Sequence, residues 1–271
     1  MRILKVSSVL LPVMLLIGRT PVGTIKLLTG TALVGLSLAA SAAEISVYSG
    51  GAVKAALSEA AAKFEKASGH RIAVEYAPIG VLLRGLAAGA KPDVVVLTLD
   101  VMAEAERNAW VVPGTATALG GVGVGVAVNE HSVAPDISTP EAFKQTLLVA
   151  KSITYINPTK GTSGKHFAEV LQRLGISEAV KAKTRLADGG YVVESVARGE
   201  IELGIQQITE ILPVTGVKLV GPLPAPLQKI TVYSAALTPY ARDAEAVREF
   251  LAYLRGAEAR GIFTAKGFST P

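Results

Sequence analysis

Residues 44–66 read EISVYSGGAVKAALSEAAAKFEK, and this stretch decides the fold class. Its first part, Glu44–Tyr48, is a short apolar run that predicts a buried β-strand. From Val53 to Lys66 the apolar residues recur at three- and four-residue spacing, which predicts an amphipathic helix. The turn between them is small and glycine-rich. A strand that leads through such a turn into a helix is half of a βαβ unit, and it predicts an α/β protein.

The same alternation continues further along the chain. Arg71–Tyr76 and Asp93–Leu97 are rich in β-branched residues and predict two more strands. Val81–Gly89 between them has leucines at helical spacing and predicts a short helix. Repeats of this kind imply a mostly parallel sheet with helices on its faces.

A glycine- and valine-rich run, Leu119–Val128 (LGGVGVGVAV), departs from this pattern. We interpret it as one long strand that passes from a first lobe to a second, and Ile230–Ala236 (ITVYSAA) as the strand that returns. The predicted fold is therefore a two-lobed α/β protein with a ligand cleft at the hinge. The first lobe would comprise residues 44–121 plus 231–271, and the second residues 122–230. The other predicted elements are strands at Ser152–Ile156 and Leu203–Gln207, a helix that begins near Ser138–Glu141, and helices at Thr162–Leu174, Tyr191–Arg198, Ala244–Arg255 and Ala257–Lys266.

Residues 1–43 have the pattern of a secretory signal peptide. They contain four basic residues and no acid, and two short apolar runs lead to the small-residue stretch Leu38–Ala43. Each run is shorter than the roughly 20 residues that a membrane span needs, although an N-terminal anchor is the alternative. We therefore expect export to the periplasm. Without residues 1–43, 23 Lys and Arg would face 22 Asp and Glu, so the net charge of +5 would fall to about +1, which argues against nucleic-acid binding.

Three predicted strand-to-helix junctions are polar or glycine-rich. Helix N-termini carry unpaired backbone N–H groups and favour negative charge, and glycine lets a ligand approach the backbone. We expect the three junctions to converge on one small anion, although each alone is also typical of a simple turn and helix cap. The candidate ligand-binding residues are Ser49, Gly50 and Gly51 in the first junction, Gly80 with Arg84 in the second, and Thr162, Ser163, Gly164 and Lys165 in the third. Arg84 and Lys165 would supply countercharge.

Tyr191 and Gln206 are further candidates at the expected rim of the second lobe, where they would bind the ligand or support the hinge backbone. The chain has no cysteine, and its three histidines lack ligand spacing, so we expect no metal site and no cofactor. Thr162–Lys165 lacks the spacing of a phosphate-binding loop, and no Ser/His/Asp triad can be assembled. A binding protein with no catalytic residue is the simplest expectation.

Several ordered stretches resemble the molybdate-binding family of type 2 periplasmic solute-binding proteins, with this chain as a divergent member. The resemblance implies two α/β lobes and delivery of the ligand to the permease of an ABC importer. We expect a monomer that meets the membrane only through that transporter and has no nucleic-acid partner. The matching stretches are Ile45–Tyr48 with Ala56–Phe64, Gly85–Val94 (GLAAGAKPDV), Val196–Ile205 (VARGEIELGI), and Phe250–Arg255 with Ile262–Phe263 and Gly267–Phe268.

The resemblance also bears on the ligand. In that family, serine hydroxyls at the first two helix starts hold a tetrahedral oxyanion, whereas this chain has Gly51-Ala52 and Ile79-Gly80 at those places. We therefore expect an organic carboxylate in preference to molybdate. Divergent proteins of this appearance include periplasmic aconitate isomerases. The alternative function is thus isomerisation of an unsaturated tricarboxylate, with His166, Lys165 or a cleft glutamate as the base.

Overall fold

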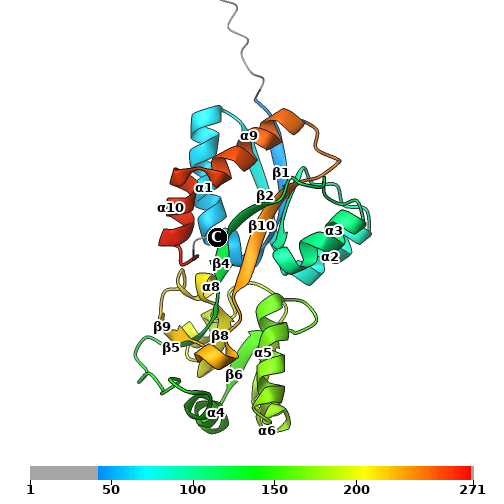
Figure 1. Cartoon of the computed structure of the whole chain (residues 1–271). Helices are drawn as coiled ribbons and strands as arrows, with labels where there is room; N and C mark the ends of the chain where they lie inside the picture. The colour runs from blue at the N-terminus through cyan, green and yellow to red at the C-terminus, as the bar shows by residue number, and fades with distance from the viewer. Residues whose placement is uncertain (1–41, 270–271) are drawn as a thin grey trace, which may run out of the picture. The chain divides into compact units, whose positions relative to one another are not determined.

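The computed structural model describes residues 42–269, which lie in one compact unit of the chain. They form two five-stranded sheets flanked by helices, which confirms the predicted two-lobed α/β architecture (Figure 1). The predicted signal peptide, residues 1–43, lies outside the described residues except for its last two. Within residues 42–269 no helix has both the length and the apolar character needed to span a membrane.

The first sheet has the strand order β2-β1-β3-β10-β4. β1 (Glu44–Gly50) lies between β2 (Arg71–Ala77) and β3 (Val94–Thr98) and runs parallel to both. β10 (Thr231–Leu237) is antiparallel to β3 and to β4 (Thr117–Val122). All strands except β10 therefore point in one direction, and β10 is the strand that arrives from the second sheet.

The second sheet repeats this arrangement in the order β7-β6-β8-β5-β9. β6 (Ile153–Ile156) runs parallel to β7 (Thr184–Ala187) and β8 (Leu203–Gln207). β5 (Val124–Asn129) is antiparallel to β8 and to β9 (Val217–Pro222). In each sheet the reversed strand is the one that enters from the other sheet. Parallel neighbours need helical crossovers, and their carboxyl ends meet at one edge, where ligands bind in open α/β sheets.

Each sheet packs helices over its own apolar core. Phe64, Phe250 and Phe263 are fully buried in the first core, and Phe143 and Phe167 in the second. Burial of such a side chain contributes about 1.5–3 kcal/mol. The first lobe has η1 (Gly51–Val53), α1 (Lys54–Ser68), α2 (Ile79–Ala87), α3 (Leu99–Arg107), α9 (Ala244–Arg255) and α10 (Ala257–Ala265), and the second has α4 (Pro140–Val149), α5 (Thr162–Arg173), α6 (Ser177–Lys181), α7 (Glu194–Ala197), α8 (Ile208–Ile211) and η2 (Ala225–Leu227).

The single long strand predicted over Leu119–Val128 is wrong, because β4 and β5 meet at Gly123 and belong to different sheets. A β-carbon on Gly123 would lie 2.9 Å from Nε2 of Gln228. Gln228 belongs to the segment that leads back into β10, so its side chain occupies the space beside the break. The break at Gly123 lets the chain change sheets next to the returning segment.

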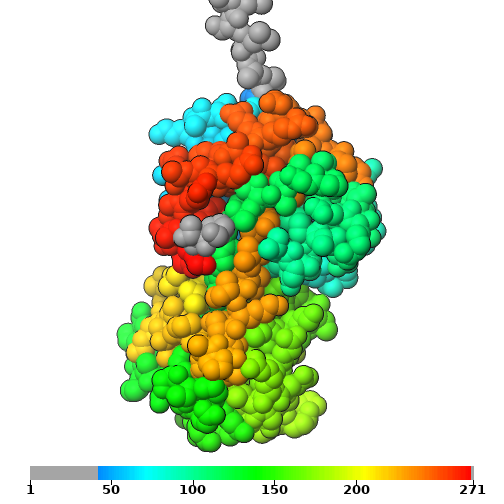
Figure 2. Space-filling model, in the orientation of Figure 1, coloured from blue at the N-terminus to red at the C-terminus, as the bar shows by residue number. Residues whose placement is uncertain are grey.

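The two lobes also touch away from the crossing strands. The backbone N–H of Gly80 in α2 donates to the carbonyl of Lys160, with 2.9 Å between nitrogen and oxygen. Next to the end of α10, a β-carbon on Gly267 would lie only 2.8 Å from a methyl group of Leu212, which follows α8. Figure 2 shows this red C-terminal segment against the yellow part of the second lobe. The lobes are thus joined by direct contacts as well as by the crossing segments.

Candidate functional site

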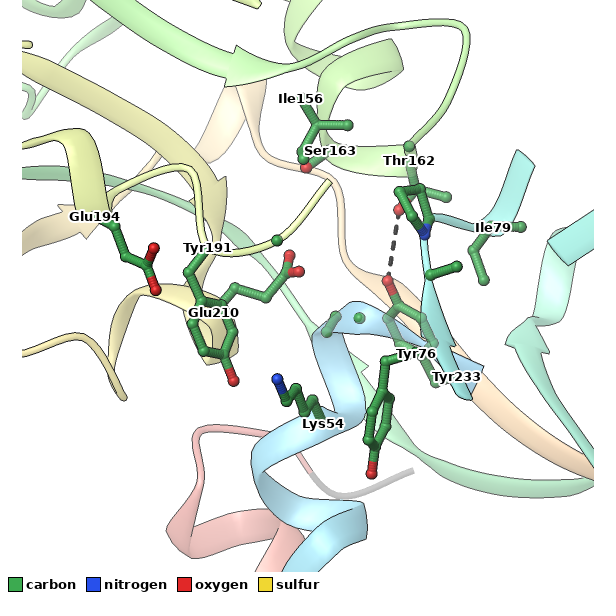
Figure 3. A pocket seen from close by; sticks show the side chains of 16 residues that line it. Lys54, Tyr76, Ile79, Ile156, Thr162, Ser163, Tyr191, Glu194, Glu210 and Tyr233 are labelled. Carbon is green, nitrogen blue, oxygen red and sulfur yellow. Dashed lines mark hydrogen bonds between the residues drawn. The ribbon is translucent and has the colours of Figure 1, made fainter. Parts of the chain in front are cut away.

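One cavity of about 240 Å³ lies where the two lobes meet. Figure 3 shows Glu210, Tyr191 and Lys54 on one side of it, and Thr162, Ile79 and Tyr233 on the other. The lining residues are Gly51, Ala52, Lys54, Tyr76, Ala77, Pro78, Ile79, Ile156, Gly161, Thr162, Ser163, Gly190, Tyr191, Glu194, Glu210 and Tyr233.

All three junctions predicted from the sequence contribute to this lining. Gly51 and Ala52 come from the first, Pro78 and Ile79 from the second, and 161–163 from the third. The three junctions therefore meet at one cavity, and the binding of a small anion there stays a prediction. Their meeting follows from the parallel topology, because the strands β1, β2 and β6 all end at the sheet edges that face the cavity.

The third junction presents the N-terminus of a long helix to the cavity. Gly161 is the N-cap of α5, and the first backbone bond of the helix runs from the N–H of Lys165 to the carbonyl of Gly161 at 3.0 Å. The amides of Thr162, Ser163 and Gly164 precede this bond and have no partner within the helix. A β-carbon on Gly164 would lie 1.8 Å from the carbonyl oxygen of Ile156, so only glycine lets α5 begin this close to β6.

The first junction presents a second helix N-terminus, from the opposite lobe. Gly50 caps η1, which continues directly into α1, and the N–H of Lys54 donates to the carbonyl of Gly51. The amides of the three η1 residues therefore lack helical partners. Two helix starts from two lobes give the cavity a positive backbone potential, which favours an anion.

Two ionisable side chains lie on the buried wall of the cavity. Glu210 is 8% exposed, and burial raises the pKa of its carboxyl to about 8. Tyr233 is 2% exposed, and burial and the charge of Glu210 raise the pKa of its phenol. The hydroxyl of Tyr233 shares a hydrogen bond with that of Thr162, at 3.4 Å, across the lobe boundary (Figure 3).

The outer rim is formed by Lys54, Tyr76, Tyr191 and Glu194. The ammonium of Lys54 lies 5.8 Å from the ring centre of Tyr76 and 5.4 Å from that of Tyr191. Tyr76 belongs to the first lobe and Tyr191 to the second, so Lys54 makes a cation–π contact across the cleft mouth. Desolvation raises the pKa of both phenols, which keeps them as neutral hydrogen-bonding groups.

Of the predicted site residues, Gly51, Thr162, Ser163 and Tyr191 line the cavity. Others stand directly behind the lining. The hydroxyl of Ser49 is buried and donates to the carbonyl of Gly50. Gly50 packs against Ile79 and Tyr233, and Gly164 against Ile156.

Gly80 and Gln206 support the lining without belonging to it. Gly80 makes the bond to Lys160 described above. The side chain of Gln206 accepts from the N–H of Val192 at 2.9 Å and donates to the carbonyl of Gly190 at 2.8 Å. Gln206 thereby fixes the backbone on both sides of Tyr191.

The structure does not bring Arg84 or Lys165 into the cavity lining, and both are exposed. The buried positions of α2 are Ile79, Leu82 and Leu86, and Arg84 lies on the opposite face of that helix. His166 is buried, and its Nε2 donates to the carbonyl of Leu227 at 2.8 Å. None of the three lines this cavity.

Five polar lining side chains were missed by sequence reasoning: Lys54, Tyr76, Glu194, Glu210 and Tyr233. Lys54 and Tyr76 lie next to junctions that the sequence does reveal, so widening each junction by two residues finds them. Glu210 ends the segment Gln206–Glu210, which the sequence places near the cleft but gives no reason to separate from its neighbours.

The fold and the cavity together define a class: two-lobed binding proteins that enclose a small ligand between their lobes. The chain belongs to the bacterial extracellular solute-binding protein family, whose model matches residues 45–269.

Two curated relatives cover most of the chain. An aconitate isomerase from Pseudomonas sp is 32% identical over 221 residues, 79% of this chain and 83% of that protein. The molybdate-binding protein ModA of Azotobacter vinelandii is 26% identical over 241 residues, 86% of this chain and 92% of that protein. The first of these likenesses is the closer in sequence.

Solved structures share the fold. The periplasmic molybdate-binding protein of Azotobacter vinelandii superposes with a TM-score of 0.72 at 19% identity, over 84% of this chain and 99% of that one. The sulfate-binding protein SubI of Mycobacterium tuberculosis gives 0.67 at 16% identity, over 83% and 86%. The chain is therefore a molybdate-binding-like, type 2 periplasmic binding protein in its architecture.

Proposed function

We propose that this protein is a periplasmic solute-binding protein that captures a small organic anion between its lobes for an ABC importer. The observation that carries the proposal is the pair of helix N-termini, η1 and α5, that reach one cavity from opposite lobes. Their unpaired amides favour a carboxylate at the point where the lobes close. The family supports the binding role, and the importer and the compartment are part of the proposal.

The lining supports an organic guest over an inorganic oxyanion. Ala52 and Ile79 stand at the first two helix starts, where neither supplies a hydroxyl. Ile156 adds a third apolar side chain, and all three are buried. An inorganic oxyanion would place oxygen atoms without hydrogen-bond donors against these apolar side chains, whereas an organic ligand would cover them with the carbon atoms between its carboxylates.

A thermal-shift panel tests this function on the protein purified without residues 1–43. The panel contains molybdate, tungstate, sulfate, citrate, cis-aconitate and trans-aconitate. A ligand at about 100 times its dissociation constant stabilises the folded state by about 2.7 kcal/mol. We expect stabilisation by an organic anion and little by the inorganic ions. Stabilisation by molybdate or tungstate alone would contradict the organic ligand.

A second function, isomerisation of an unsaturated tricarboxylate, is favoured by the likeness to the aconitate isomerase. A base would remove a proton from a carbon next to a carboxylate, the double bond would shift, and the proton would return at the other end of the allyl group. His166 and Lys165, the bases expected from the sequence, do not line the cavity, whereas Glu210 does. Glu210 is therefore the carboxyl group we assign to this step, which needs the ionised form that Glu210 reaches as the pH approaches its pKa of about 8.

Proton NMR of cis-aconitate incubated with the protein tests the isomerase directly. Growth of trans-aconitate signals at a rate proportional to protein concentration supports an enzyme, and its loss in Glu210→Gln would assign the base. The control is Glu169→Gln, which changes an exposed glutamate on α5 outside the cavity. Tight binding of cis-aconitate without turnover would instead support the function of a binding protein for transport.

A further inference from the structure

The side chains around the cavity pose a charge problem for an anion site. The lining contains one cation, Lys54, and two acids, Glu194 and Glu210. Lys54 and Glu194 lie at the exposed rim, so water screens them, while Glu210 is buried next to the helix starts that would hold the guest. An ionised Glu210 would repel an anion at short range in a medium of low polarity.

Glu210 has no ion-pair partner among residues 42–269. Its Oε1 lies 2.9 Å from the position that a β-carbon on Gly51 would take, so the carboxyl reaches across the cleft to the start of η1. Its other neighbours in the lining are the phenols of Tyr191 and Tyr233, whose own pKa values rise in part from the charge of Glu210. Of the lysines on or next to neighbouring elements, Lys218 in β9 and Lys266 after α10 do not line the cavity, and Lys266 pairs with Glu59.

We propose that Glu210 is a neutral carboxylic acid in the empty cavity and that it donates its proton in a hydrogen bond to the captured anion. This inference rests on the proposed function, since it names the residue that recognises the anion from the side of α8. The neutral acid removes the repulsion and adds a donor next to the amides at the start of η1. The raised pKa of Glu210, about 8, agrees with this protonation state at neutral pH.

A protonated Glu210 would also affect which ligands the cavity accepts. The acid offers one hydrogen to the guest, and the helix amides offer several more, so the site matches a ligand with acceptor oxygens at two ends. Above the pKa of Glu210, capture must take up a proton. Affinity should then fall about tenfold for each further pH unit.

Infrared spectroscopy of the ligand-free protein tests the protonation state without any ligand. The difference between wild type and Glu210→Gln should contain the carbonyl stretch of a neutral carboxylic acid at about pH 6, and this band should be gone at about pH 10. The control Glu169→Gln should leave the band in place, because that residue is exposed on α5. A carboxylate signal alone at about pH 6 would overturn the proposal.

Calorimetric titration with cis-aconitate tests whether binding of the anion is coupled to proton uptake by Glu210. Binding is measured at about pH 6 and about pH 9.5 in two buffers of different ionisation enthalpy, which together give the protons taken up. We expect close to one proton at the higher pH and almost none at the lower, and none at either pH for Glu210→Gln. Tight binding at the higher pH without proton uptake overturns the inference. Failure of cis-aconitate to bind counts against the proposed ligand, and the infrared result then decides the role of Glu210 by itself.

Discussion

Gln228 and Val124 form a two-way hydrogen-bonded pair at the hinge. The N–H of Val124 donates to Oε1 of Gln228 at 3.0 Å, and Nε2 of Gln228 donates to the carbonyl of Val124 at 2.8 Å. A side-chain amide thus takes the place of a neighbouring strand at the point where β4 ends and β5 begins. The pair joins the two segments of chain that cross between the lobes.

Loss of this pair should destabilise the whole protein. Gln228→Ala leaves the N–H of Val124 without its acceptor, while the carbonyl of Val124 keeps its bond from the N–H of Leu223 at 3.0 Å. The unpaired N–H should lower the free energy of unfolding by about 1–3 kcal/mol. Urea unfolding followed by circular dichroism measures the change. Gln145→Ala, an exposed position on α4, should alter stability by less than about 0.5 kcal/mol. Equal stabilities of the two variants would refute a structural role for Gln228.

Glu210 should make stability depend on pH. The folded state raises its pKa from 4.5 to about 8, so the folded protein holds this proton more tightly than the unfolded chain. The resulting stability is fully present below about pH 4.5 and is lost as pH rises towards 8, at up to roughly 1.4 kcal/mol per pH unit. Urea unfolding at several pH values should show this loss for wild type relative to Glu210→Gln. A constant difference between the two across this range would contradict the raised pKa.

Two glycine substitutions should have opposite effects. Gly164→Ala places a β-carbon 1.8 Å from the carbonyl oxygen of Ile156, so α5 must move, at a cost of about 1–3 kcal/mol or more. Gly261→Ala lies in α10 with nothing within 4 Å of the new atom and should stabilise the protein by up to about 1 kcal/mol. Thermal unfolding of both variants measures the two changes in stability. A stable Gly164→Ala protein would show that the start of α5 tolerates a shift.

Lys54 should contribute modestly to anion affinity. Lys54→Ala removes the cation at the rim, and a screened charge of this kind is worth about 0.5–1 kcal/mol, a factor of about 2–5 in the dissociation constant. The effect should shrink as salt is added. Arg84→Ala and Lys165→Ala serve as controls, because both side chains are exposed outside the cavity lining. A larger loss in Arg84→Ala than in Lys54→Ala would mean that the ligand lies elsewhere.

Elements with strong local patterns were predictable from the sequence. Helix α9 has the predicted bounds, and α5 differs by one residue, because each keeps apolar residues on one face throughout. The strand β9 was missed because its residues are half-exposed and include Lys218 and Pro222. The predicted helix over Tyr191–Arg198 is only the short α7, since the chain first turns through Val192 and Val193. The division into lobes at residues 121/122 and 230/231 stays a prediction.

Only the parts of the site that are built from residues close together in the sequence were predictable. The junctions at Gly51 and Thr162 follow from strand-to-helix order, which a sequence displays directly. Glu210 and Gly51 are 159 residues apart in the sequence, and their approach depends on how the two lobes pack against each other. Arg84 was expected in the site because it follows a junction closely, yet the helical rotation after Ile79 turns it outward. Proximity in sequence predicts the backbone of such a site better than its charges.

The bond from Gly80 to Lys160 is made by main-chain atoms, and this has an evolutionary consequence. Only a substitution to proline at position 80 removes the donating N–H, and no substitution at position 160 removes the accepting carbonyl. Side chains that line the cavity are therefore free to diverge towards new guests while this part of the lobe contact is inherited unchanged. Position 80 itself has little such freedom, because any β-carbon there would come within 3.0 Å of that acceptor oxygen.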